Sequence, residues 1–214
     1  MEKTKYSTNR GLNFFRKFIP KDLLKRKSKA HFDLVLKDRW KFVVGDKILD
    51  VGCGRGQFME LNPNSKEIHG LEIEKQSNNL NIKIGDASKK IPYPDNTFDS
   101  VTLFHVLEHF DKPMKALIEI KRVLKKDGRL IIVVPNYSYR HFYQEYTHVR
   151  PWPKKAVFGI LVDAGYKKIK VYSGPRYNQI VTSILFMFPI LRYTIEKILG
   201  WIRPSEILAI AHKE

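Results

Sequence analysis

The sequence predicts an α/β fold, doubly wound, with a mostly parallel seven-stranded sheet, helices on both faces and a last strand that runs antiparallel. Three observations predict it. From residue 47 onward, short apolar runs alternate with helical segments. The glycine cluster Gly-Cys-Gly-Arg-Gly follows the first run directly. The last two runs have no clear crossover helix pattern between them, as two antiparallel neighbours allow.

The seven apolar runs have strand length, and helical segments separate most of them. They cover residues 47–51, 67–73, 81–86, 98–104, 129–135, 167–173 and 206–212. Strands that alternate with helices form parallel sheets that are covered on both faces. We therefore expect a layered domain over residues 45–214.

Two helices are marked by their end signals. The first is expected over 111–124, where Asp111 caps the free N–H groups and Pro113 fits the first turn. A turn at Lys-Asp-Gly follows it. The second is expected over 153–164 and stops at Gly165.

The charge is strongly positive, with 39 Lys and Arg against 22 Asp and Glu, a net of +17. Residues 1–44 are read as a basic N-terminal helical extension, whose apolar residues recur near helical spacing through residue 30 and continue as a helix over 32–44. Such a surface attracts nucleic acid, anionic lipid or phosphorylated substrates. The alternative is a lysine-rich surface that only keeps the protein soluble.

Compartment signals are few. The chain has a single cysteine, Cys53, so it forms no internal disulfide. Its first residues lack the apolar stretch of a signal peptide, and no uncharged apolar run reaches the roughly 20 residues of a spanning helix. We expect a cytoplasmic protein.

The glycine cluster and a later acid predict a nucleoside-binding crevice. Gly52 and Gly54 let the backbone turn tightly and approach a ligand. Glu72 ends the second strand, where an acid can accept hydrogen bonds from ribose hydroxyls. This arrangement fits NAD and S-adenosylmethionine equally. The spacing does not match the dinucleotide fingerprint, because Gln57 stands where the third glycine is expected.

Five segments in order resemble the motifs of class I S-adenosylmethionine-dependent methyltransferases, a Rossmann-like family, and are closest to its type 11 and type 23 groups. The resemblance covers 45–172, and its motifs are ILDVGCGRG (48–56), GLEIEK (70–75), GDASK (85–89), FDSVTLFHVLEHF (98–110) and LIEIKRVLKKDGRLIIVVPN (117–136). Two departures are visible. The segment after the first motif is short, and the fourth lacks the Asn-Pro-Pro-Tyr sequence of many amino-methylating DNA enzymes.

The resemblance implies that S-adenosylmethionine is the cofactor and S-adenosylhomocysteine its product. It assigns the methionine moiety to the residues of the first motif and to the end of the fourth strand, the ribose to the second motif, and the adenine to the second and third. The cofactor-binding residues it implies are Asp50, Gly52 and Gly54 with Phe104 for methionine, Glu72 for ribose, and Ile73, Asp86 and Ala87 for adenine.

Histidines are the candidates for chemistry at the acceptor. His105 follows the fourth strand, and His148 lies after the fifth, where related enzymes often carry a histidine. A general base is needed only if the acceptor is protonated. His109 stands four residues after His105, but the segment is leaving a strand and no third ligand is evident, so no metal is expected. Glu108 and His109 could be catalytic or bind a metal, but residues at this position more often cap the next helix.

The acceptor is read from what surrounds the crevice. The loop 136–152 is rich in tyrosine, histidine and arginine, and an apolar insertion is expected at 174–205. Within it, residues 180–191 can lie at a membrane surface, roof the site or pack on the core. A small-molecule or lipid-like acceptor is the leading hypothesis, with possible contact to an anionic membrane surface. An RNA or other nucleic-acid methyltransferase and a non-catalytic cofactor-binding protein stay open.

Overall fold

The computed structural model describes residues 21–62, 66–79, 81–137, 142–173 and 206–214, with isolated positions between 190 and 198. The first part of the basic extension and most of the predicted insertion at 174–205 lie outside the described residues. Within the described part, no helix has both the length and the apolar character needed to cross a membrane.

Seven strands form one sheet, as predicted. They are β1 (Lys47–Val51), β2 (Glu67–Glu72), β3 (Ile82–Ile84), β4 (Phe98–Phe104), β5 (Leu124–Pro135), β6 (Lys167–Ser173) and β7 (Glu206–His212). Their order is β3-β2-β1-β4-β5-β7-β6. β7 runs antiparallel to both β5 and β6, and the other neighbouring pairs are parallel. The predicted fold class, including the antiparallel last strand, is confirmed.

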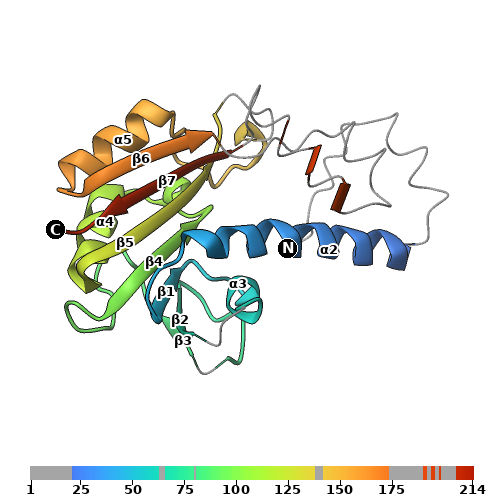
Figure 1. Ribbon diagram of the computed structural model, residues 1–214, viewed down its shortest axis with the longest axis horizontal. Helices are drawn as coiled ribbons and strands as arrows, with labels where there is room; N and C mark the ends of the chain where they lie inside the picture. Colours follow the sequence, from blue (N-terminus) through green and yellow to red (C-terminus); the bar gives the residue numbers. More distant parts are fainter. Residues whose placement is uncertain are drawn as a thin grey trace.

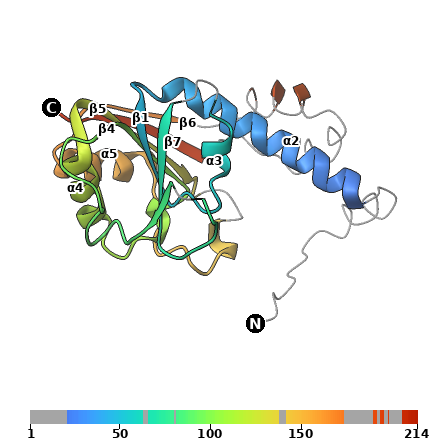
Figure 2. The same cartoon turned by 90° about the horizontal axis from the view of Figure 1, so that it is seen from below.

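Helices cover both faces of the sheet (Figures 1 and 2). One face carries α4 (Pro113–Val123) and α5 (Lys154–Asp163), and the other carries the end of α2 (Lys21–Arg39) with η1 (Trp40–Phe42) and α3 (Gln57–Glu60). Two further 3₁₀ turns, η2 (Leu107–His109) and η3 (Phe142–Gln144), follow β4 and β5.

The two faces have separate apolar cores. The larger core joins α4 and α5 to the sheet, with Leu117 and Leu161 fully buried. In the smaller core the ring of Trp40 stacks on Phe58 with centroids 4.4 Å apart and an interplanar angle of 13°. Leu36 of α2 belongs to this core as well. The end of the predicted N-terminal extension therefore packs into the domain that follows it.

Two helix boundaries differ from those predicted. The helix expected over 32–44 is the end of α2, which stops at Arg39 before the turn η1. α4 begins at Pro113 with Lys112 as its N-cap, and no side chain caps it, so the predicted role of Asp111 is wrong. The proline in the first turn was predicted correctly.

The fifth strand starts earlier than predicted. Leu124 pairs with Phe98, and Arg129 pairs with Ser100, so the residues between them bulge out of the ladder. Asp127 has a φ of 59° within this bulge. Leu124 is fully buried, so packing draws it into the sheet although the Lys-Asp-Gly sequence after it favours a turn.

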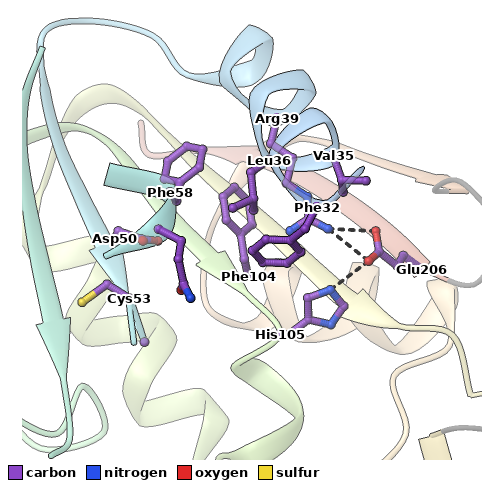
Figure 3. Close-up of a pocket in the computed structure, with 12 residues that line it drawn as sticks. Phe32, Val35, Leu36, Arg39, Asp50, Cys53, Phe58, Phe104, His105 and Glu206 are labelled. Atoms are coloured by element: carbon purple, nitrogen blue, oxygen red, sulfur yellow. Dashed lines mark hydrogen bonds and ion pairs between the residues drawn. The ribbon is translucent and has the colours of Figure 1, made fainter. Parts of the chain in front are cut away.

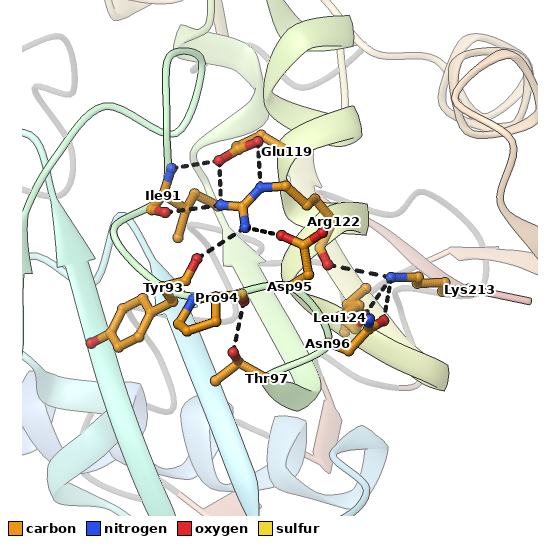
Figure 4. A network of polar contacts seen from close by, with 10 residues as sticks. All are labelled: Ile91, Tyr93, Pro94, Asp95, Asn96, Thr97, Glu119, Arg122, Leu124 and Lys213. Carbon is orange, nitrogen blue, oxygen red and sulfur yellow. Dashed lines mark hydrogen bonds and ion pairs between the residues drawn. The ribbon is translucent and has the colours of Figure 1, made fainter.

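A polar network fixes the segment that leads into β4 (Figure 4). The guanidinium of Arg122 donates to the carboxylates of Glu119 and Asp95 and to the carbonyl of Ile91. Lys213, which follows β7, donates to the carbonyl of Leu124 at 2.7 Å. These contacts lie at the amino ends of the parallel strands, whereas the candidate site lies at their carboxyl ends.

Replacing Trp40 by alanine should lower the free energy of unfolding by about 3–5 kcal/mol, because it empties a buried position that stacks on Phe58. Urea unfolding measures it. Val162→Ala is the control, since 48% of Val162 is exposed, and it should change stability by less than about 0.5 kcal/mol. Equal effects of the two variants would contradict the packing of η1 into the core.

Candidate cofactor and acceptor site

The loop after β1 turns through three glycines with left-handed backbone. Gly52, Gly54 and Gly56 have φ values of 70°, 56° and 86°. A Cβ at Gly52 would come 2.3 Å from a methyl group of Val106, so only glycine fits there. The N–H of Gly52 donates to the carbonyl of Leu71 at 2.7 Å, which holds the loop against the end of β2.

Asp50 lies beneath this loop with only 3% of its surface exposed. Its Oδ1 accepts a hydrogen bond from Thr102 Oγ1 at 2.6 Å. Burial raises the pKa of Asp50 to about 7, against the opposing effects of the Thr102 hydrogen bond and the charge of Arg39. A cation that reaches this carboxylate would offset the cost of its burial.

Glu72 binds the glycine loop directly. Its Oε2 accepts the N–H of Gly54 at 2.7 Å, and its Oε1 accepts the N–H of Ile73 at 2.9 Å. The side chain of Ile73 projects into solvent, with 64% exposed. Asp50, the loop and Glu72 therefore meet at the carboxyl ends of β1 and β2, as the sequence predicted.

Asp86 follows β3, the neighbour of β2. Its Oδ1 accepts from the N–H and the hydroxyl of Ser88 at 2.8 and 2.7 Å, and the hydroxyl hydrogen bond is the main cause of its lowered pKa. Ala87 beside it is buried. Asp86 is thus ionised and acts only as an acceptor at neutral pH.

A cavity of about 480 Å³ opens at this edge of the sheet (Figure 3). Four of the predicted site residues line it, while the predicted cofactor-binding residues Gly54, Glu72, Ile73, Asp86 and Ala87 do not. Its walls are formed by Phe32, Val35, Leu36, Arg39, Asp50, Gly52, Cys53, Gln57, Phe58, Phe104, His105 and Glu206.

The wall opposite the glycine loop comes from α2. Phe32, Val35, Leu36 and Arg39 recur at intervals of three and four residues, so they share one helix face. The guanidinium carbon of Arg39 lies 4.9 Å from the ring centroid of Phe104. The predicted extension therefore supplies one side of the site, which the sequence reasoning did not anticipate.

A buried ion network closes the cavity (Figure 3). Arg39 Nη2 donates to both carboxylate oxygens of Glu206 at 3.0 Å. His105 Nε2 lies 2.9 Å from Glu206 Oε1. Burial alone would raise the pKa of Glu206, but the charges of Arg39 and His105 outweigh it and lower the pKa to about 2.

His105 is held as a cation in this network. Desolvation would lower its pKa, but the charge of Glu206, the hydrogen bond to Glu206 and the Glu108 carboxylate 3.6 Å from Nδ1 raise it to about 9. Since 40% of the side chain is exposed to the cavity, water screens part of this attraction. A protonated imidazole cannot accept a proton, so the geometry favours His105 as a positive group in the cavity wall rather than as a base.

His148 does not line the cavity. Its Nδ1 lies 2.8 Å from the carbonyl of Phe142, and its ring centroid is 4.9 Å from that of His109. Ligand atoms of Glu108, His109 and His148 all lie within 4.8 Å of one another. The expectation of no metal rested on the lack of a third ligand near His109, and the fold brings His148 there. The catalytic role of His148 stays a prediction.

Cys53 also lines the cavity, in the glycine loop. It is buried, and this burial raises the pKa of its thiol to about 12. The thiol is therefore not a nucleophile at neutral pH, and its sulfur fills the space above Gly70, whose Cβ would come 2.5 Å from it.

Comparison with known proteins identifies methyltransferases among the similar chains. Residues 49–132 match the model of a methyltransferase domain family. An uncharacterised protein of Methanocaldococcus jannaschii is 41% identical over 42% of this chain and 40% of its own length. A demethylmenaquinone methyltransferase of Symbiobacterium thermophilum is 32% identical over 47% of each. A tRNA carboxymethyluridine methyltransferase of Schizosaccharomyces pombe is 29% identical over 42% of each.

Residues 49–132 form a methyltransferase domain of the class I S-adenosylmethionine-dependent type, as the motifs indicated. The fold of the chain is that of a SAM-dependent methyltransferase from Archaeoglobus fulgidus, with a TM-score of 0.66 and 23% identity over 85% of this chain and 94% of the other. The matched segments span about two fifths of the length of the first curated relatives.

Asp50→Asn should stabilise the ligand-free protein at pH 8 by roughly 1–3 kcal/mol while changing little at pH 4. The folded pKa near 7 exceeds the usual 3.8, so this group's contribution is greatest below pH 4 and is lost as the pH rises to 7. Urea unfolding at both pH values measures it. Asp46→Asn, whose side chain is 97% exposed, is the control, and equal effects of Asp50→Asn at both pH values would contradict the assignment.

Glu206→Gln should lower the pKa of His105 from about 9 by at least one unit, because it removes the carboxylate 2.9 Å away. NMR titration of the His105 ring measures the change. Protonated His105 stabilises the fold below pH 6.5, and this contribution is lost as the pH rises through 9. The free energy of unfolding of the variant should therefore depend less on pH over that interval. Glu67→Gln, beside His69, should leave His105 unchanged.

Proposed function

We propose that the protein transfers a methyl group from S-adenosylmethionine to a small-molecule or lipid-like acceptor. One observation carries the proposal: the glycine loop and Asp50 open directly into a cavity whose opposite wall is the apolar face of α2. The loop and acids provide a nucleoside site, and the adjoining cavity provides room for an acceptor. Because the sulfonium methyl carbon is already electrophilic, the protein mainly has to align the acceptor with it.

The polar groups match the parts of the cofactor. Asp50 faces the methionine ammonium, and Glu72 accepts the ribose hydroxyls through lone pairs that its two backbone hydrogen bonds leave available. Exposed Ile73 packs on the adenine, while Asp86 accepts the adenine amino group. S-adenosylhomocysteine remains after transfer.

The apolar wall favours an acceptor with hydrophobic surface. Phe32, Val35 and Leu36 present only carbon to the cavity, while Arg39 and His105 add positive charge at one end. An apolar molecule with one polar or anionic group suits both. The similarity to an enzyme named for demethylmenaquinone, a lipid-like molecule, supports the same class.

A nucleic-acid acceptor is the second candidate. The net charge of +17 and the similarity to a tRNA methyltransferase favour it. The cytoplasmic location stays a prediction. The contact with an anionic membrane surface is also a prediction, and it rests on residues 1–30 and 180–191. Binding to anionic vesicles at low salt, measured by co-sedimentation, tests the membrane contact.

The test combines binding with transfer. Calorimetry should show one site for S-adenosylhomocysteine, weakened at least tenfold in Asp50→Asn. Methyl-labelled S-adenosylmethionine is then incubated with the protein and an extract of its own cells, and the products are partitioned. Label in the organic phase supports the proposal. Label in nucleic acid supports the second candidate, and cofactor binding without label anywhere indicates a binding protein without turnover.

Phe32→Ala should lower the rate of label transfer at limiting extract about tenfold, while the dissociation constant for S-adenosylhomocysteine changes less than twofold. Phe32 lines the acceptor side of the cavity and is 47% exposed, so its removal spares the core. Phe158→Ala, 48% exposed on α5, is the matched control and should leave both values unchanged. Equal rates in the two variants would remove α2 from the acceptor site.

A further inference from the structure

Three potential metal ligands converge beside the cavity from two segments. Glu108 and His109 belong to the turn η2 after β4, and His148 belongs to the loop after β5. Their ligand atoms all lie within 4.8 Å of one another. The backbone joins the two segments, because the N–H of Val149 donates to the carbonyl of Glu108 at 2.8 Å.

The carboxyl group of Glu108 is fully buried, and its oxygens lack hydrogen-bond donors among the described residues. None of its surface is exposed, and neither oxygen has a hydrogen-bond partner in the described part of the chain. Its nearest positive group is His105, whose Nδ1 lies 3.6 Å from Oε1. A buried carboxylate is costly unless several donors or a metal ion meet its lone pairs. Glu108 is therefore a buried carboxyl group with unused ligand capacity.

Both imidazoles hydrogen-bond to a backbone carbonyl through Nδ1. Nδ1 of His109 lies 3.1 Å from the carbonyl of Thr147, and Nδ1 of His148 lies 2.8 Å from that of Phe142. A carbonyl can only accept, so each Nδ1 carries the proton and each Nε2 keeps a free lone pair. Histidines that bind metals typically donate their other ring nitrogen to such a carbonyl.

We propose that Glu108, His109 and His148 form a binding site for a divalent transition metal, with Zn²⁺ as the reference ion. Two imidazoles and one carboxylate suit Zn²⁺ or Fe²⁺, whereas Mg²⁺ and Ca²⁺ require mostly oxygen ligands. Tetrahedral ligands around Zn²⁺ lie about 3.4 Å apart. The three side chains therefore close by about 1 Å when the ion binds, which the exposed position of His109 permits.

The site adjoins the cavity through His105, which contacts Glu108 on one side and lines the cavity on the other. A metal with three protein ligands keeps a position for an oxygen ligand and lowers the pKa of a hydroxyl bound there. A role of the metal ion in activating the acceptor rests on the proposed function. Binding of the ion does not.

The experiment uses the full chain without a polyhistidine tag, stripped with a chelator. Co²⁺ is titrated first, because its visible absorption reports coordination by nitrogen ligands, and Zn²⁺ affinity is then measured by competition with a chromophoric chelator. One equivalent should bind. His109→Ala, His148→Ala and Glu108→Gln should each weaken Zn²⁺ binding at least tenfold. His212→Ala, a histidine on the far strand end, is the control and should leave it unchanged.

S-adenosylhomocysteine binding is measured on every sample as an independent check of folding. The metal site is overturned if the wild type binds S-adenosylhomocysteine but not Zn²⁺. It is also overturned if all three ligand variants bind Zn²⁺ as tightly as the wild type does. In both cases the proposed function stands. If Zn²⁺ binds as expected while no S-adenosylhomocysteine binds, the metal site stands and the proposed function fails.

Discussion

The pairing of Arg39 with Glu206 is the interaction on which the shape of the site depends. It joins residues 167 positions apart in the sequence, through two hydrogen bonds of 3.0 Å. One partner ends α2 and the other begins β7, so the pair fixes a helix from one part of the chain against a strand from another. Removing Arg39 would leave His105 as the remaining charged partner of Glu206, and breaking a buried ion pair in this way is strongly destabilising.

The same pair sets the electrostatics around it. Glu206 holds His105 protonated, and Arg39 opposes the burial that raises the pKa of Asp50. The cavity thus has a cationic end at Arg39 and His105 and a carboxylate end at Asp50. A cofactor that carries a sulfonium and an ammonium group is attracted to the second end and repelled from the first. Under the proposed function, this charge division orients the cofactor and leaves the cationic end to the acceptor.

The sequence predicted the fold well because its signals are local. Apolar runs of strand length and the glycines of the first motif depend on a few adjacent residues. The bulge in β5 was missed because Leu124 joins the sheet through packing against distant residues, despite the turn sequence that follows it. The face that α2 presents to the cavity was missed for the same reason, since periodicity identifies a helix face but not what it covers.

The positions of some side chains of the site follow from local sequence signals, whereas the positions of others depend on distant parts of the chain. Asp50, Glu72 and Asp86 follow from strand ends, whereas Glu206 stands at a strand beginning. It reaches the site because β7 is antiparallel, and Pro135 at the end of β5 pairs with it. The antiparallel direction was predicted, so the position of Glu206 could have been deduced. The meeting of His148 with Glu108 could not, because a loop path decides it.

The place of β7 in the sheet has a consequence for the order of folding. β6 hydrogen-bonds within the sheet only through β7, and β7 separates it from β5. Residues 167–173 therefore cannot pair into the sheet until residues 206–212 have inserted. This insertion joins positions more than 70 residues apart, as Pro135 with Glu206 shows. Such non-local pairing is slow because its loop entropy is lost before its contacts form. The glycine loop, whose partners lie within about 20 residues, can become structured first, and the acceptor side of the cavity is completed last.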